Sequence, residues 1–166
     1  MDEQEFTEWA TGCQRGLLRS AYIVTGDLHR SQDLVQEALV KVALRWGRLR
    51  GGNPTAYART IIVRDHISWW RKRRDTPVAD PSDLTTVAAV SSDPEAALVV
   101  RRALGRLTVS QRAVVVLRHF DDLSERETAD VLGVSVGTVK SQNAAALARL
   151  RGGAPELLDL IGGHRE

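Results

Sequence analysis

The sequence predicts an all-α protein made of two small helical domains joined by an acidic flexible linker. Apolar residues recur every three or four positions through most of the chain, which is the period of an amphipathic helix. No stretch of Val, Ile or Thr shows sustained strict alternation, so we expect essentially no sheet. The helical period stops between Asp75 and Pro94, where prolines and small polar residues are typical of a linker.

In the first half, a helix is expected to begin after Gly26, where Asp27 is suited to cap its first turn. Its apolar positions form one stripe, which consists of Leu34, Val35, Ala38, Leu39, Val42 and Trp46. The polar positions of the same helix fall mainly on the other face, and they are Asp33, Gln36, Glu37 and Lys41. A second helix should start near Pro54 and run toward Arg74, because proline fits the first turn of a helix.

In the second half, two segments match the capping box, in which the side chains of the first and fourth residues bond to each other's backbone. They begin at Thr108 and at Ser124, with Gln111 and Glu127 in the fourth position. Apolar periodicity follows each of them. Both segments therefore predict the start of a helix.

The segment from Ser124 to Leu150 has the pattern of a helix-turn-helix. A capped helix from Glu125 to Leu132 meets Gly133, which suits the left-handed turn that ends a helix. Ser135 can cap the second helix, whose first turns would enter the major groove of DNA. The exposed candidates for base and phosphate contacts are Thr138, Lys140, Ser141, Gln142, Ala145, Arg149 and Arg151.

Charge is distributed unevenly along the chain, although 23 basic against 21 acidic residues give a net charge of only +2. Residues 45–74 carry a net +8 and residues 101–152 a net +4. Between them, residues 75–100 hold five acidic residues and no Lys or Arg. Two positive modules separated by an acidic spacer favour two contacts with a polyanion such as DNA.

The basic block ends in two adjacent tryptophans, Trp69 and Trp70, followed by four cations. Neighbouring residues of a helix point about 100° apart, so both indoles cannot fill one core pocket. We expect one indole to pack and the other to remain near the basic face, where it can stack on an unpaired base. The alternative is that both indoles are structural and the cations merely solvated.

Three motifs together resemble a bacterial RNA polymerase sigma factor of the sigma-70 family. They are the stretch Asp33–Glu37, the helix that carries Tyr57, Arg64 and Trp69-Trp70-Arg71, and the run from Leu123-Ser124 to Gly137-Thr138-Val139-Lys140-Ser141. The pattern is most similar to the extracytoplasmic-function group, in particular its SigE-like actinobacterial branch. The sequence departs from the common pattern at Arg64, where many members have Asn, and at Gln142-Asn143, where an Arg-Leu pair is common.

The resemblance implies a role for each part of the chain: residues 1–75 as sigma region 2, 76–93 as the acidic linker, 94–152 as the helix-turn-helix region 4 and 153–166 as a tail. It implies a surface for the β′ clamp helices of core RNA polymerase at Asp33, Leu34, Gln36 and Glu37. It implies contacts to the −10 promoter element from Arg59, Arg64, His66, Trp69, Trp70, Arg71, Lys72, Arg73 and Arg74. It implies contacts to the −35 element from Ser135, Thr138, Lys140, Ser141, Gln142, Ala145 and Arg149, while the apolar side of the same module docks on the β flap.

Several other functions are disfavoured. The sequence has no Walker loop, dinucleotide fingerprint or zincin motif, so we expect neither an enzyme nor a cofactor. His29 and His119 lie near carboxylates, but we expect no metal there. No apolar run exceeds five residues and the first residues are acidic, so we expect a cytoplasmic protein without membrane insertion.

Two alternatives remain open from the sequence. One is a dimeric helix-turn-helix repressor with a sensing module, although such a module needs no second DNA-binding site. The other is a sigma-like protein that only binds polymerase. The resemblance also leaves open an anti-sigma factor as a further partner.

Overall fold

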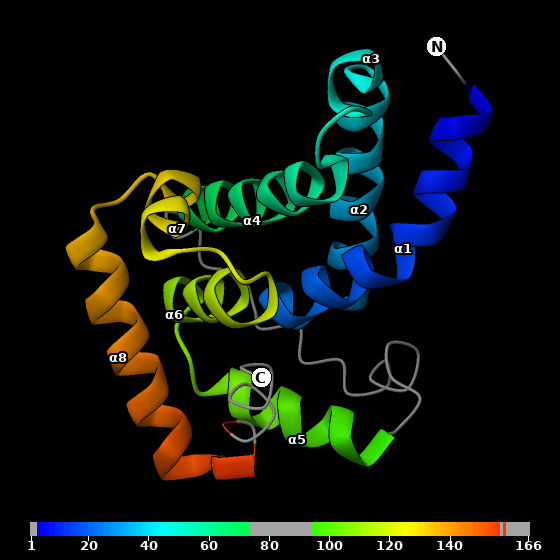
Figure 1. Ribbon diagram of the computed structural model, residues 1–166. Coiled ribbons are helices and arrows are strands. Elements are labelled where there is room, and N and C mark those ends of the chain that lie inside the picture. The colour runs from blue at the N-terminus through cyan, green and yellow to red at the C-terminus, as the bar shows by residue number, and fades with distance from the viewer. Residues whose placement is uncertain (1–2, 74–93, 157, 159–166) are drawn as a thin grey trace. The chain divides into compact units, whose positions relative to one another are not determined.

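The computed structural model describes residues 3–73, 94–156 and 158 (Figure 1). All regular elements in this part are helices, which confirms the predicted all-α class. The chain divides into two compact units, Met1–Ser82 and Asp83–Glu166. The expected linker, residues 76–93, lies outside the described residues. Among the described helices, none is both long and apolar enough to cross a bilayer.

The described part of the first unit consists of α1 (Glu3–Thr25), α2 (Leu28–Ala43), α3 (Trp46–Leu49) and α4 (Pro54–Arg73). Gly26 ends α1 with a φ of 69°, a left-handed conformation that glycine adopts without strain. Asp27 then caps α2 as predicted, because its carboxylate accepts the backbone N–H of Arg30 at 3.0 Å. Asn53 does the same for α4, where its side-chain oxygen accepts the N–H of Ala56 at 2.9 Å.

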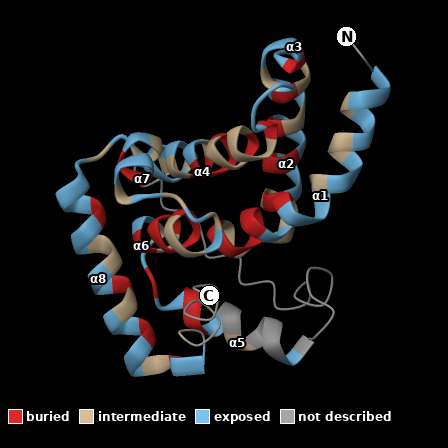
Figure 2. Cartoon of the chain, in the orientation of Figure 1, coloured by how far each residue is buried: buried red, intermediate tan, exposed pale blue. Residues whose placement is uncertain are grey.

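The core of the first unit forms where α2 packs against both α1 and α4, and α1 also contacts α4. Figure 2 shows buried residues gathered along α2 and along the C-terminal half of α1. The predicted stripe of α2 is its buried face, since Leu34, Val35, Ala38 and Val42 are at most 2% exposed. The burial of each of the larger side chains, Leu34, Val35 and Val42, stabilises the fold by roughly 1.5–3 kcal/mol relative to an exposed one.

Trp46 corrects the predicted extent of this stripe. The helix ends at Ala43, and Trp46 instead begins the short helix α3. Its ring, 3% exposed, lies 5.3 Å from that of Phe6 and 5.2 Å from that of Trp9, centroid to centroid. The indole N–H of Trp9 donates to the Thr55 hydroxyl at 3.1 Å. An aromatic cluster therefore joins α1, α3 and the start of α4.

The described part of the second unit consists of α5 (Pro94–Gly105), α6 (Val109–Val115), the π-helical turn η2 (Val116–Phe120), α7 (Glu125–Leu132) and α8 (Val136–Gly153). Both predicted capping boxes are confirmed. At α6, the Gln111 N–H donates to the Thr108 hydroxyl and the Thr108 N–H donates to the Gln111 side chain. At α7, Ser124 and Glu127 exchange the same pair of bonds, at 2.7 and 3.1 Å.

The helix-turn-helix has the predicted geometry. Gly133 ends α7 in the left-handed region, with φ 65° and ψ 37°. Ser135 caps α8, because its hydroxyl accepts the Thr138 N–H at 3.1 Å. Val139 is fully buried and packs with Ala129 in a small apolar cluster, which fixes α8 against α7.

The turn η2 was not predicted. It continues α6 without a break, and the N–H of Asp121 bonds to the carbonyl of Val116 at 2.9 Å, five residues back. Asp122 then has a φ of 54°. A π-helical turn holds more residues than an α-helical one and so shifts the apolar stripe. Because Ala113–Leu117 are all apolar, that shift is hidden and the sequence pattern is that of one uninterrupted helix.

The capping box of α7 gives a prediction for stability. Ser124→Ala should lower the free energy of unfolding of the second unit by about 1 kcal/mol, because one N-terminal amide loses its acceptor. Denaturant unfolding measures this value. Ser110→Ala, which changes an exposed serine of α6 beyond its cap, is the matched control and should cost much less.

The same box sets the pH dependence of that difference. The pKa of Glu127 is lowered from its ordinary value, first by the hydrogen bond from the Ser124 backbone N–H and then by the Ser124 hydroxyl. A pKa lowered by folding contributes stability above the unfolded-state pKa and loses it as the pH falls through the folded-state value. The difference in free energy of unfolding between wild type and Ser124→Ala should therefore become smaller in acid. A difference that grows as the pH falls would contradict this account.

Candidate polymerase and nucleic-acid interfaces

The outward side of α2 displays three of the polar residues expected to meet polymerase. Asp33, Gln36 and Glu37 are all exposed and lie opposite the buried stripe. Two apolar side chains continue the same side of the helix, with Val40 58% and Leu44 81% exposed. We call these five residues the α2 outer face. Val40 and Leu44 were not predicted from the sequence as part of this face, although both positions lie opposite the apolar stripe.

Leu34 does not belong to this face. It was expected among the polymerase contacts, but it is 1% exposed and lies in the core of the first unit. Its place in the predicted apolar stripe already conflicts with a polymerase contact, because the 100° turn per residue from Asp33 carries it inward. Its role is to hold α2 in place.

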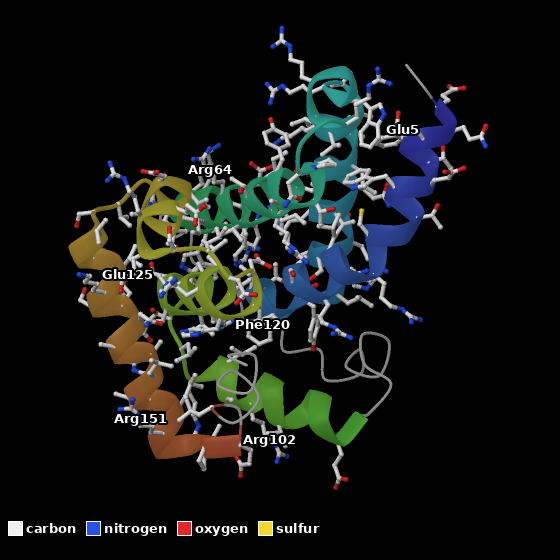
Figure 3. The ribbon with its side chains drawn as sticks, viewed as in Figure 1. Glu5, Arg64, Arg102, Phe120, Glu125 and Arg151 are labelled. Carbon is white, nitrogen blue, oxygen red and sulfur yellow. The ribbon has the colours of Figure 1, made fainter. Side chains whose placement is uncertain are left out.

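The basic residues of α4 gather toward its C-terminal end. Arg64, Arg71 and Lys72 are exposed, and Arg64 projects outward from the helix (Figure 3). Arg59 and Arg73 are half-buried, and Arg74 lies outside the described residues. Cations at a helix C-terminus are favoured by the helix dipole, so this end of α4 can carry a high charge density. We call Arg71, Lys72 and Arg73 the basic end of α4, while Arg64 lies near the middle of the helix.

His66 corrects another expectation. It was expected to contact DNA, but it is 4% exposed and stacks on Trp69, with ring centroids 6.0 Å apart and planes 25° apart. The imidazole faces the interior because α4 packs on α2 along this side. Its contribution is to support the ring of Trp69.

The two tryptophans differ as expected from their adjacent positions. Trp70 is 43% exposed, whereas Trp69 is half-buried. The guanidinium carbons of Arg30 and Arg73 lie over the Trp69 ring, 4.8 and 4.5 Å from its centroid. Trp70 is therefore the indole that is available for stacking on a base.

The acidic residue Asp65 of α4 forms an ion pair with Lys41 of α2. The ammonium of Lys41 on α2 lies 2.5 Å from the carboxylate of Asp65, and both are partly exposed. Asp65 is the one acidic residue in the basic block 45–74. Because its charge is paired toward α2, it does not neutralise the basic end of α4 directly.

The residues expected to meet the −35 element lie on α8 or at its cap. All are exposed except the half-buried Gln142, and they are Ser135, Thr138, Lys140, Ser141, Gln142, Ala145 and Arg149. Lys140 lies 3.7 Å from the carboxylate of Glu125 at the start of α7. Arg149 donates to the backbone carbonyl of Arg106 at 3.1 Å, which fastens the far end of α8.

One contact of α8 was not expected. The imidazole of His119, in η2, lies 2.9 Å from the side-chain oxygen of Asn143 and donates its Nε2–H to it. Asn143 stands where an apolar residue is common, and its amide has found a partner across the unit. This bond fixes the rotation of α8 relative to η2. The two residues meet because of the π-helical turn, which the sequence pattern does not predict.

Neither histidine site considered for a metal has a third ligand. In the parts of the chain that the structure describes, no group of three or more His, Cys, Asp or Glu side chains is arranged to hold an ion. The lone Cys13 is partly buried on α1, and burial raises the pKa of its thiol.

Comparison with known proteins identifies the family. The model of sigma-70 region 2 matches residues 9–76, and the model of sigma-70 region 4 matches residues 97–150. Over 150 residues the chain is 39% identical to the RNA polymerase sigma-E factor of Streptomyces avermitilis, with 89% of this chain and 83% of that protein covered. The chain is an extracytoplasmic-function sigma factor of the sigma-70 family. It is also 33% identical to the sigma factor SigM of Mycobacterium tuberculosis, with 90% and 76% covered.

Solved sigma factors share the fold. The structure of RpoE in complex with the anti-sigma factor NepR from Bartonella quintana matches with a TM-score of 0.63 at 21% identity, covering 98% of this chain and 99% of that one. The sigma factor SigJ of Mycobacterium tuberculosis matches with a TM-score of 0.59 at 25% identity, covering 87% and 53%. This sigma factor directs RNA polymerase to promoters, and nothing in these comparisons supports the repressor alternative.

Proposed function

We propose that this sigma factor guides core RNA polymerase with three separate surfaces. The α2 outer face contacts the β′ clamp helices, and the basic end of α4 with Trp70 captures the −10 element. The helix α8 reads the −35 element while the apolar side of its unit docks on the β flap. The observation that carries the proposal is the separation of charge within the first unit, where α2 presents exposed acids and α4 presents exposed cations. One small domain thus offers one surface to a protein and another to DNA.

The remaining parts of the proposal follow from the family. Residues 1–75 act as region 2, 76–93 as a linker through the basic path of the polymerase, 94–152 as region 4 and 153–166 as a tail. The protein acts by binding rather than by catalysis, and in the cytoplasm, where polymerase and promoters meet. An anti-sigma factor is a further partner in this proposal, because the similar RpoE was solved with one.

Run-off transcription with core polymerase tests the function directly. Wild type should give promoter-specific transcripts, whereas Asp33→Lys combined with Glu37→Lys should reduce them about tenfold or more, because like charges meet at the β′ contact. The matched control reverses two exposed acids of α1, Glu3→Lys with Glu8→Lys, and should transcribe normally. Equal polymerase binding by both double variants would contradict the α2 assignment, and polymerase binding by wild type without transcripts would favour the protein that only binds polymerase.

The exposed indole gives a second prediction. Trp70→Ala holoenzyme should show about fivefold or more weaker permanganate reactivity of the −10 thymines, because a stacked base contributes roughly 1–3 kcal/mol. Trp70→Phe keeps an aromatic face and should retain most of the signal. Binding to the −35 element, measured on a duplex that lacks the −10 sequence, should stay unchanged in both variants. A Trp70→Ala enzyme that opens promoters normally would show that this indole does not stack on a base.

Lys140 should contact a phosphate rather than a base. Lys140→Ala should then weaken binding to all −35 variants alike and reduce the slope of log K against log salt by about 0.9. Arg102→Ala, on the exposed side of α5 in the same unit, removes one charge elsewhere and is the control. A changed base preference with an unchanged slope would assign Lys140 to base recognition instead.

A further inference from the structure

Two arginines from different helices share one indole in the first unit. Arg30 lies in the first turn of α2 and Arg73 in the last turn of α4, and their guanidinium carbons are 4.8 and 4.5 Å from the Trp69 ring centroid. His66 stacks on the same ring. Trp69 therefore holds two cations in place through contacts with its π-system.

In the part of the chain that the structure describes, neither cation has a carboxylate partner. Among the described residues, Arg30 and Arg73 form no ion pair within 4.0 Å, although exposed Asp33 lies three residues after Arg30 on α2. Asp27 caps α2 and Asp65 pairs with Lys41. Two cations held beside one ring repel each other, and an anion between them would turn that repulsion into attraction.

The geometry suits a phosphate. A guanidinium carries its N–H donors at its edges, and these edges bind phosphate oxygens in pairs. The Nε of Arg30 is buried without a partner among the described residues, so its terminal nitrogens are the ones left for a ligand. Arg30 as a whole is half-buried, so part of its side chain reaches solvent.

We infer that Arg30 and Arg73 form a clamp for one backbone phosphate of the unpaired −10 strand, with Trp69 as the positioning residue that holds both guanidiniums. The inference rests on the proposed −10 contact and adds to it a residue of α2, outside the basic block. The exposed ring of Trp70 lies 6.3 Å from that of Trp69. A base stacked on Trp70 would lie next to the Trp69 ring, so that its own backbone is within reach of the clamp.

The experiment uses holoenzyme and a promoter fragment already unpaired at the −10 element. Arg30→Gln should weaken its binding about tenfold at low salt and reduce the slope of log K against log salt by about 0.7, the value for one phosphate of a single strand. Arg15→Gln removes an equal charge from an exposed position of α1 and should leave the slope as it is. Arg73→Gln, at the end of α4, should behave like Arg30→Gln and serves if that variant fails to fold.

Neutral methylphosphonate linkages, placed one at a time through the −10 strand, locate the phosphate. Wild-type holoenzyme should bind more weakly when one particular linkage is neutral. Neutralising that same linkage should hardly weaken the binding of Arg30→Gln holoenzyme further. If Arg30→Gln lowers only the melting temperature while the slope and the linkage effects match wild type, the stack merely ties α2 to α4 and the clamp is wrong. If wild type itself shows no −10 binding although it binds core polymerase, the proposed −10 contact fails instead.

Discussion

Each half of this chain has to close a hydrophobic core from very few helices, and the rest of the structure depends on this constraint. In the first unit, one stripe of α2 is buried against both α1 and α4. Because that stripe satisfies the core, the opposite side of α2 carries no structural duty. It can therefore expose Val40 and Leu44 beside its acids, which would be an unfavourable arrangement without a partner.

The same constraint explains how a small unit tolerates dense positive charge. A core this small cannot bury carboxylates to pair with these cations. The cations instead lie where the helix backbone and an aromatic ring stabilise them. The basic end of α4 lies at a helix C-terminus, whose dipole favours positive charge. The Trp69 ring stabilises Arg30 and Arg73, and Lys41 forms an ion pair with Asp65, the one acidic residue among residues 45–74. Because the contacts with the ring do not pair the two arginines with a carboxylate, their charge can serve the proposed contact with DNA.

The features predicted correctly from the sequence are those that depend on local chemistry. The caps at Asp27, Ser124 and Ser135 and the left-handed Gly133 need only neighbouring backbone, so residue type and spacing predicted them. The errors concern direction and tertiary contacts. His66 points inward, Trp46 starts a new helix and His119 bonds to Asn143, and each of these depends on tertiary packing. The burial of Leu34, in contrast, follows from the predicted apolar stripe itself.

Base recognition by α8 is constrained by what its first turns already do. The Ser135 hydroxyl accepts the Thr138 N–H and lies 2.9 Å from the Thr138 hydroxyl, while Ser141 donates to the Thr138 carbonyl at 3.0 Å. These hydroxyls are engaged in capping α8 and in bonds within its first turns. They therefore contribute less to the choice of a base than their exposure suggests. Gln142 is the remaining side chain able to bond a base in two places. In the proposed −35 contact, the His119–Asn143 bond helps to fix the rotation of α8. The turn η2, which lies outside the recognition helix, therefore influences the direction in which Gln142 faces the groove.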